Sequence, residues 1–206
     1  MLKIDNGFLK VDIAGFHPYL AKISDVVDIF YKKDSESPIN FSIQNHKLTI
    51  SKPTNFVNKI EVDHKSIFVN YNNWENLENQ IKYFKEIVDG IFKCVGFKPE
   101  EVLRIGHAIH YIKKEDIENI TNKIFSTSHK VLNFNDVAIE IKLDETRAVK
   151  KILSTPLDVS QNKQVLLINA DYYSTKTIKT DKILDFLTES GKYFNTEESI
   201  ISGIYE

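Results

Sequence analysis

Hydrophobic residues recur at steps of three and four between Trp74 and Val95, which is the spacing of one face of an α-helix. Residues that usually delimit helices stand at both ends of this segment. Asn73 occupies the N-cap position, and Gly96 follows the last turn, where a left-handed residue closes many helices. Pro99 comes shortly afterwards, as expected once a helix has ended. The pattern therefore predicts a long amphipathic helix over Trp74–Val95.

Before this helix, apolar and polar residues alternate, as they do in strands with one buried face. The alternation is interrupted by short polar segments with the composition of turns. The stretch Ile23–Tyr31 is apolar enough to be either a strand or a helix. The predicted strands are residues 9–13, a hairpin over residues 39–50 around Asn45-His46, and a pair at Val57–Val62 and Ser66–Tyr71 around residues 63–65.

After the helix, the pattern again predicts strands followed by a helix. Alternating Val137, Ile139, Ile141 and Leu143 indicate a strand with one buried face, whereas Val165–Ile168 is apolar on both faces, as in a central strand. The other predicted elements are a strand at Val102–Ile112, a short helix at Glu115–Phe125 and a closing helix at Asp181–Phe194.

Successive strands joined by short turns favour antiparallel pairing, and hence an α+β fold over a doubly wound α/β fold. We expect mainly antiparallel sheet packed on the long central amphipathic helix, within a single α+β domain of residues 1–206. Because strands followed by a helix occur twice, the pattern also allows two similar β-then-α halves. The subdivision would then fall between residues 1–97 and residues 98–206.

The charge of the chain is balanced, with 27 Lys and Arg against 29 Asp and Glu. Duplex nucleic acid is therefore disfavoured as a partner, and Arg104 and Arg147 are the only arginines for bidentate phosphate contacts. The longest fully apolar run, Val165–Ile168, is too short to span a bilayer, so we expect a soluble, cytoplasmic protein without a membrane segment. Abundant Ile, Lys and Asn suggest an AT-rich prokaryotic or phage genome.

The sequence contains no established metal, cofactor or nucleotide motif. Cys94 is the only cysteine, which excludes an internal disulfide and a multi-thiolate metal site. His107 and His110 would share a face on a helix, but their surroundings predict a strand, in which they point to opposite faces. HExxH, CxxC, GxGxxG and GxxxxGK[ST] are all absent. The sequence therefore predicts neither a metal site nor a cofactor.

Asp171 is the most suggestive acidic residue, because it follows the predicted central strand and would lie where that strand ends. A side chain there can reach a cleft, or it can simply cap a turn. Together with His107, His110 and Arg104, Asp171 is a candidate catalytic residue of a small enzyme whose cleft lies between the two halves.

Phe68, Tyr71 and Trp74 form an aromatic cluster where the predicted strand meets the long helix. Such a cluster can be core packing beneath the helix start, or it can be an exposed surface that binds a partner.

The segment from Phe68 to Trp74 that leads into a long amphipathic helix, followed by Arg104-Ile105-Gly106, resembles an uncharacterised prokaryotic protein family described only as sporadically distributed. The later strand Ile168–Tyr172 fits the same layout, and the resemblance extends over about residues 39 to 206. Where that family has a run like Arg-Tyr-Ile-Asn, this chain has His107–Ile112. The resemblance implies no known activity and transfers no catalytic residue.

The leading hypothesis is a non-enzymatic module that binds another protein in a toxin–antitoxin, chaperone or phage-defence setting, and that can also associate with itself through its sheet edges as a homodimer. The small enzyme described above is the first alternative. The second is a single-stranded nucleic-acid binder with an aromatic sheet face, which would need lysines around Phe68, Tyr71 or Tyr111.

Overall fold

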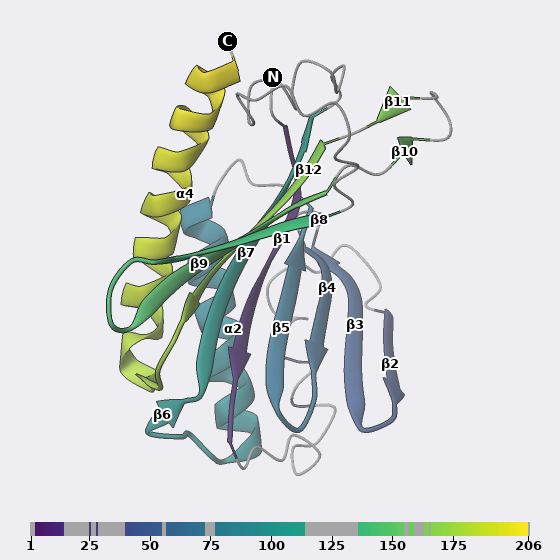
Figure 1. The fold of residues 1–206 in the computed structure, drawn as a ribbon. Helices are drawn as coiled ribbons and strands as arrows, with labels where there is room; N and C mark the ends of the chain where they lie inside the picture. The colour runs from purple at the N-terminus through teal and green to yellow at the C-terminus, as the bar shows by residue number, and fades with distance from the viewer. Residues whose placement is uncertain are drawn as a thin grey trace.

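The chain folds around one large antiparallel sheet with two α-helices, α2 and α4, against one of its faces (Figure 1). The α+β class and the mainly antiparallel pairing predicted from the sequence are confirmed. The computed structural model describes residues 3–14, 25, 28, 40–54, 57–72, 77–113, 136–154, 157–158, 163–164 and 166–205.

The sheet has nine strands in the order β2-β3-β4-β5-β1-β7-β12-β9-β8, and every neighbouring pair is antiparallel. The strands of the sheet are β1 (Lys3–Asp12), β2 (Asn40–Gln44), β3 (Lys47–Thr54), β4 (Val57–Val62), β5 (Ser66–Tyr71), β7 (Arg104–Lys113), β8 (Asp136–Lys142), β9 (Arg147–Ser154) and β12 (Leu166–Ser174).

Two short strand pairs and the helices are the other elements whose bounds the structure gives. The remaining elements are β6 (Glu101–Val102) paired with β13 (Ile178–Lys179), β10 (Leu157–Asp158) paired with β11 (Lys163–Gln164), α2 (Leu77–Val95), the 3-10 turn η2 (Thr180–Lys182) and α4 (Ile183–Tyr205).

The core lies between the sheet and the two helices. Alternate residues of the middle strands face the helices and are completely buried, including Leu9 and Val11 of β1 and Ile105 of β7. From α2, Phe84 and Val88 are fully buried as well and belong to the same hydrophobic cluster, so the apolar face that the sequence predicts is the buried face of this helix. The middle strands thus bury one of their two alternating faces, as their sequence indicated.

The two predicted hairpins are confirmed, and local chemistry explains both turns. Asn45 and His46 have φ of 50° and 63°, which is the left-handed pair that a two-residue type I′ turn between β2 and β3 requires. Between β4 and β5, the Asp63 carboxylate accepts hydrogen bonds from the backbone N–H groups of Lys65 and Ser66 at 2.7 and 2.8 Å.

Helix α2 ends at Val95, as predicted, and a Schellman motif closes it. The N–H of Phe97 donates to the carbonyl of Phe92 at 3.1 Å, and the N–H of Gly96 donates to that of Lys93 at 3.2 Å. Gly96 has φ of 69°, the left-handed conformation that this motif requires. Residues 73–76, which include the predicted N-cap and Trp74, lie outside the described residues.

Helices α2 and α4 pack against each other at Gly191. A β-carbon at this position would lie 3.2 Å from Ile81 Cδ1 and 3.3 Å from Leu77 Cδ2, so only glycine fits without movement of these side chains. In the described part of the chain, neither helix meets the length and apolarity needed to cross a bilayer.

Several predicted boundaries differ from the structure. The strand predicted at Val102–Ile112 is divided, because Leu103 interrupts it between β6 and β7. The closing helix, predicted over Asp181–Phe194, continues to Tyr205. The predicted short helix Glu115–Phe125 lies outside the described residues, as does most of Ile23–Tyr31.

Gly96 allows a direct test of the helix end, because no heavy atom lies within 4 Å of a β-carbon built there. A side chain at position 96 therefore meets no steric clash, and it lowers stability only because the backbone there is left-handed. We expect Gly96→Ala to lower the free energy of unfolding by about 1 kcal/mol in urea denaturation, and Gly96→Asn to lower it by less. Equal stability of the alanine variant and the wild type would contradict the left-handed helix end.

Candidate functional site

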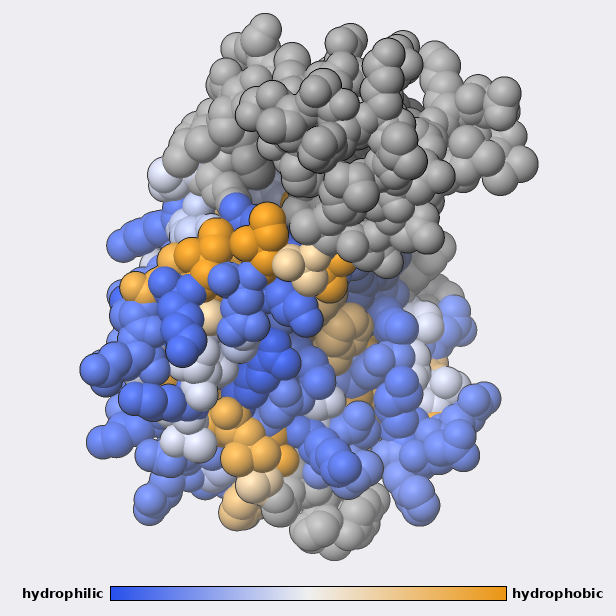
Figure 2. Space-filling model, viewed as in Figure 1, coloured by the Kyte–Doolittle hydropathy of each residue, from blue (hydrophilic) through white to orange (hydrophobic). Residues whose placement is uncertain are grey.

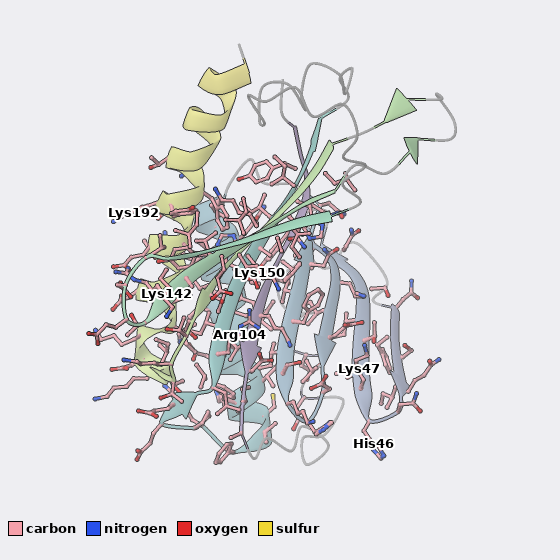
Figure 3. The ribbon with its side chains drawn as sticks, in the orientation of Figure 1. His46, Lys47, Arg104, Lys142, Lys150 and Lys192 are labelled. Atoms are coloured by element: carbon pink, nitrogen blue, oxygen red, sulfur yellow. The ribbon has the colours of Figure 1, made fainter. Side chains whose placement is uncertain are left out.

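The face of the sheet opposite α2 and α4 carries the charged side chains of the central strands. Neighbouring strands place Glu140, Lys150 and Asp171 in one row across β8, β9 and β12. The next row places Tyr173 of β12 beside Gly106 of β7. Figure 3 shows Arg104 and Lys150 over the middle of this face. We refer to it as the open face.

Arg104 and Asp171, two of the predicted catalytic candidates, meet on the open face. The Arg104 guanidinium donates from Nη2 to Asp171 Oδ2 at 2.8 Å, and its central carbon lies 4.4 Å from the centre of the Tyr173 ring. Gly106 makes room for this arrangement, since a β-carbon there would lie 3.3 Å from Asp171 Oδ1. The guanidinium is thus held by one ion pair and one stacking contact.

Partial burial raises the pKa of Asp171, and the positive charge of Arg104 opposes this effect. The Asp171 side chain retains 26% of its exposure and that of Arg104 retains 45%. Solvent therefore screens the pair, which limits its contribution to stability. Arg104 and Asp171 thus form a partly exposed ion pair with a defined geometry.

His107 lies on the other face of β7, inside the core. It has no exposed surface, and its ring contacts that of Phe194 at 4.8 Å between centroids. The Ser190 hydroxyl donates to the Leu187 carbonyl, so its oxygen accepts from His107 Nδ1–H at 2.6 Å. Burial lowers the pKa of His107 to about 3, and the ring is neutral at physiological pH.

His110 lies on the open face, so β7 places the two histidines on opposite sides, as expected of a strand. The ring of His110 meets that of Phe8 edge to face at 5.7 Å. Among the described residues, no group of three or more His, Cys, Asp or Glu is arranged to hold a metal ion.

Two pockets lie away from these candidates. One, of about 420 Å³, lies between the segment after α2 and the turn η2, around Pro99 and Thr180. The other, of about 240 Å³, lies between α2 and α4 over Leu77, Ile81 and Gly191. Neither is lined by Arg104, Asp171 or the two histidines of β7.

The predicted aromatic cluster is split between the two faces. Tyr71 is completely buried, and its hydroxyl donates to the backbone carbonyl of Gln80 at 2.9 Å, which ties β5 to α2. Phe68 points to the open face, where its ring lies 5.3 Å from that of Phe8. Trp74 lies outside the described residues.

The outermost strands expose apolar side chains that the sequence pattern placed in the core. Ile139 and Ile141 of β8 are 48% and 41% exposed, and Phe41 and Ile43 of β2 are 51% and 50% exposed. Figure 2 shows an apolar band where β8 lies in Figure 1, and a smaller apolar patch below it. The alternating pattern identified these segments as strands. It could not show that they lie at the edges of the sheet, because that position depends on which strands pair.

Comparison with known proteins does not assign this chain to a family. A scan against protein-family models gives no match to this chain, and a search of curated proteins gives no significant match. The resemblance to a sporadically distributed prokaryotic family therefore stays a prediction.

The burial of His107 predicts a pH dependence of stability. Since its pKa falls from 6.5 to about 3 on folding, the unfolded chain binds more protons between these values, and stability decreases as the pH falls through this range. From pH 7 to pH 5 the loss from this group should be about 2 kcal/mol. In urea denaturation at both pH values, His107→Phe should remove most of this loss.

His64 lies exposed in the turn between β4 and β5, so His64→Gln is the matched control and should keep the wild-type pH dependence. Identical pH dependence of His107→Phe and the wild type would show that His107 does not titrate as its burial requires.

Proposed function

We propose that this chain is a non-enzymatic protein-binding module that accepts an extended segment of a partner along the edge strand β2. In strand addition, the backbone of the added segment pairs with the edge while alternate side chains contact the sheet surface. A chaperone client or a toxin with an unpaired strand would offer such a segment, in keeping with the settings proposed from the sequence.

The observation that supports this proposal most is that β2 lacks features that usually protect the edge of a sheet from pairing with another strand. Its five residues, Asn40–Gln44, contain no charge and no proline, and it pairs with β3 without a bulge. Natural proteins usually protect sheet edges with one of these features, because a flat apolar edge recruits other strands. The absence of all three in an exposed outer strand favours a partner at this edge.

The apolar surface of β2 is continuous with the core. In the register of the sheet, Phe41 lies beside Ile50 of β3, and Ile50 lies beside Ile60 of β4. Ile50 and Ile60 are completely buried, whereas Phe41 is 51% exposed. An added strand with apolar residues at alternate positions would extend this row and cover the exposed ring.

We also propose that the chain consists of two similar β-then-α halves. In the first half, β1 is followed by β2–β5, the last of which pairs with β1 and leads into α2. In the second half, β7 is followed by β8, β9 and β12, the last of which pairs with β7 and leads into α4. Each half then packs on its own helix, α2 is the central helix of the first half, and β2 and β8 are equivalent outer edges.

Single-stranded nucleic-acid binding has one supporting feature, the Phe8–Phe68 ring pair near Lys10 and Lys59. Lys59 Nζ lies 5.8 Å from the centre of the Phe68 ring. Both lysines, however, form ion pairs with carboxylates: Lys10 with Asp12 at 2.8 Å and Lys59 with Glu61 at 3.0 Å. Because these carboxylates offset the positive charge of the two lysines, the attraction for phosphates is weakened, which favours the protein-binding proposal.

Binding can be tested with a short fluorescent peptide that has valine at alternate positions and threonine or lysine between them. The peptide should bind in the micromolar range by fluorescence anisotropy, and Phe41→Lys should weaken binding about ten-fold or more. The matched control is Leu103→Lys, because Leu103 is also 51% exposed but lies between β6 and β7.

A second peptide of the same composition, with its valines in one block, should bind poorly because its apolar side chains no longer share a face. Equal binding of both peptides, or equal loss in Phe41→Lys and Leu103→Lys, would contradict strand addition at β2.

A further inference from the structure

The outer side of β8 has backbone groups available for a further strand. β8 is the last strand of the sheet, and in the described part of the chain its outer side is not paired. The N–H of Leu143 donates to the carbonyl of Arg147 at 3.0 Å, so odd-numbered residues in this stretch direct their backbone groups toward β9. Ala138, Glu140 and Lys142 therefore direct theirs outward.

We propose that β8 pairs with β8 of a second copy of this chain, antiparallel and about a two-fold axis through Ile141. Such a dimer would join the two sheets into one. A two-fold axis makes each contact twice, once from each copy. The strand must therefore be complementary to a second copy of itself that runs in the opposite direction.

The sequence of β8 meets this requirement in one register. With Ile141 on the axis, Glu140 of each copy lies opposite Lys142 of the other, and Ile139 lies opposite Leu143. Glu140 and Lys142 are also residues whose backbone groups face outward, so the hydrogen-bonded pairs would be the charge-complementary ones. Centring on Glu140 would instead place two glutamates opposite each other, which is unfavourable.

The apolar side of β8 favours the same register. Ile139, Ile141 and Leu143, the residue after β8, are 48%, 41% and 40% exposed, and Figure 2 shows an apolar band along this strand. Ile141 lies beside Val149 of β9, which is completely buried. Pairing about Ile141 would bring the bands of two copies together and extend the core across the junction.

A second copy fits this edge better than an unrelated segment does, because β8 itself carries the opposite charges that its own pairing needs. β2 has no charged residue, so the two outer edges differ in what they select. The proposal goes beyond the binding function at β2 and does not depend on it. A junction of one strand pair is small, so we expect a reversible dimer with a dissociation constant in the micromolar range.

Sedimentation velocity over micromolar concentrations tests the association. The wild type should shift from 23.8 kDa toward twice that mass as concentration rises. Lys142→Glu and Glu140→Lys should each weaken the dimer about ten-fold or more, and the double variant Glu140→Lys/Lys142→Glu should restore it. Lys65→Glu, the same charge change in the exposed turn after β4, should have no effect.

Disulfide cross-linking tests the register. In a Cys94→Ser background, Ile141→Cys should give a covalent dimer on mild oxidation with diamide, because residues facing each other on the axis lie within disulfide distance. Ile139→Cys should cross-link much less. A monomer at all concentrations, a double charge variant no better than the single ones, or preferred cross-linking through Ile139→Cys would overturn the proposal.

Phe41→Lys separates the two edges. It should weaken binding of the valine peptide and leave the dimer intact, whereas Lys142→Glu should weaken the dimer and leave peptide binding intact. Loss of both activities in either variant would show that β2 and β8 are not independent surfaces.

Discussion

The antiparallel pairing of β1 with β7 is the interaction on which the rest of the fold depends. β1 lies between β5 and β7, so it joins the strands before α2 to the strands after it. Leu9, in the middle of β1, faces the core beside Val69 on one side and His107 on the other. A shift of this pairing by one residue would turn the apolar side chains of β1 toward solvent, and burial therefore fixes its register.

The same register determines the chemistry of the open face. It places Lys10 beside Gly106, and Gly106 beside Tyr173, so the position without a side chain falls where Arg104 reaches Asp171. On this face Arg104 forms an ion pair with Asp171, Lys10 with Asp12 and Lys59 with Glu61. Because these opposite charges offset one another, they contribute little net field to attract a highly charged ligand.

Features that depend on neighbouring residues could be predicted from the sequence, and features that depend on pairing could not. The end of α2 at Val95 and the turn at Asn45 and His46 follow from local backbone chemistry. Arg104 and Asp171 were each identified as candidates, but their contact depends on the pairing of β7 with β12 and has no local signal. The exposure of Ile141 was missed because alternation shows which face is apolar and not whether another element covers it.

The central position of β1 also has a consequence for how the chain acquires its structure during synthesis. Leu9 pairs with Val69 and with His107, which are 60 and 98 residues further along the chain. A strand near the N-terminus thus leaves the ribosome long before either neighbour exists, and its apolar residues stay unpaired during this interval. Contacts of such long sequence separation slow folding, so the assembly of this sheet should follow translation of β7 and not accompany that of β1.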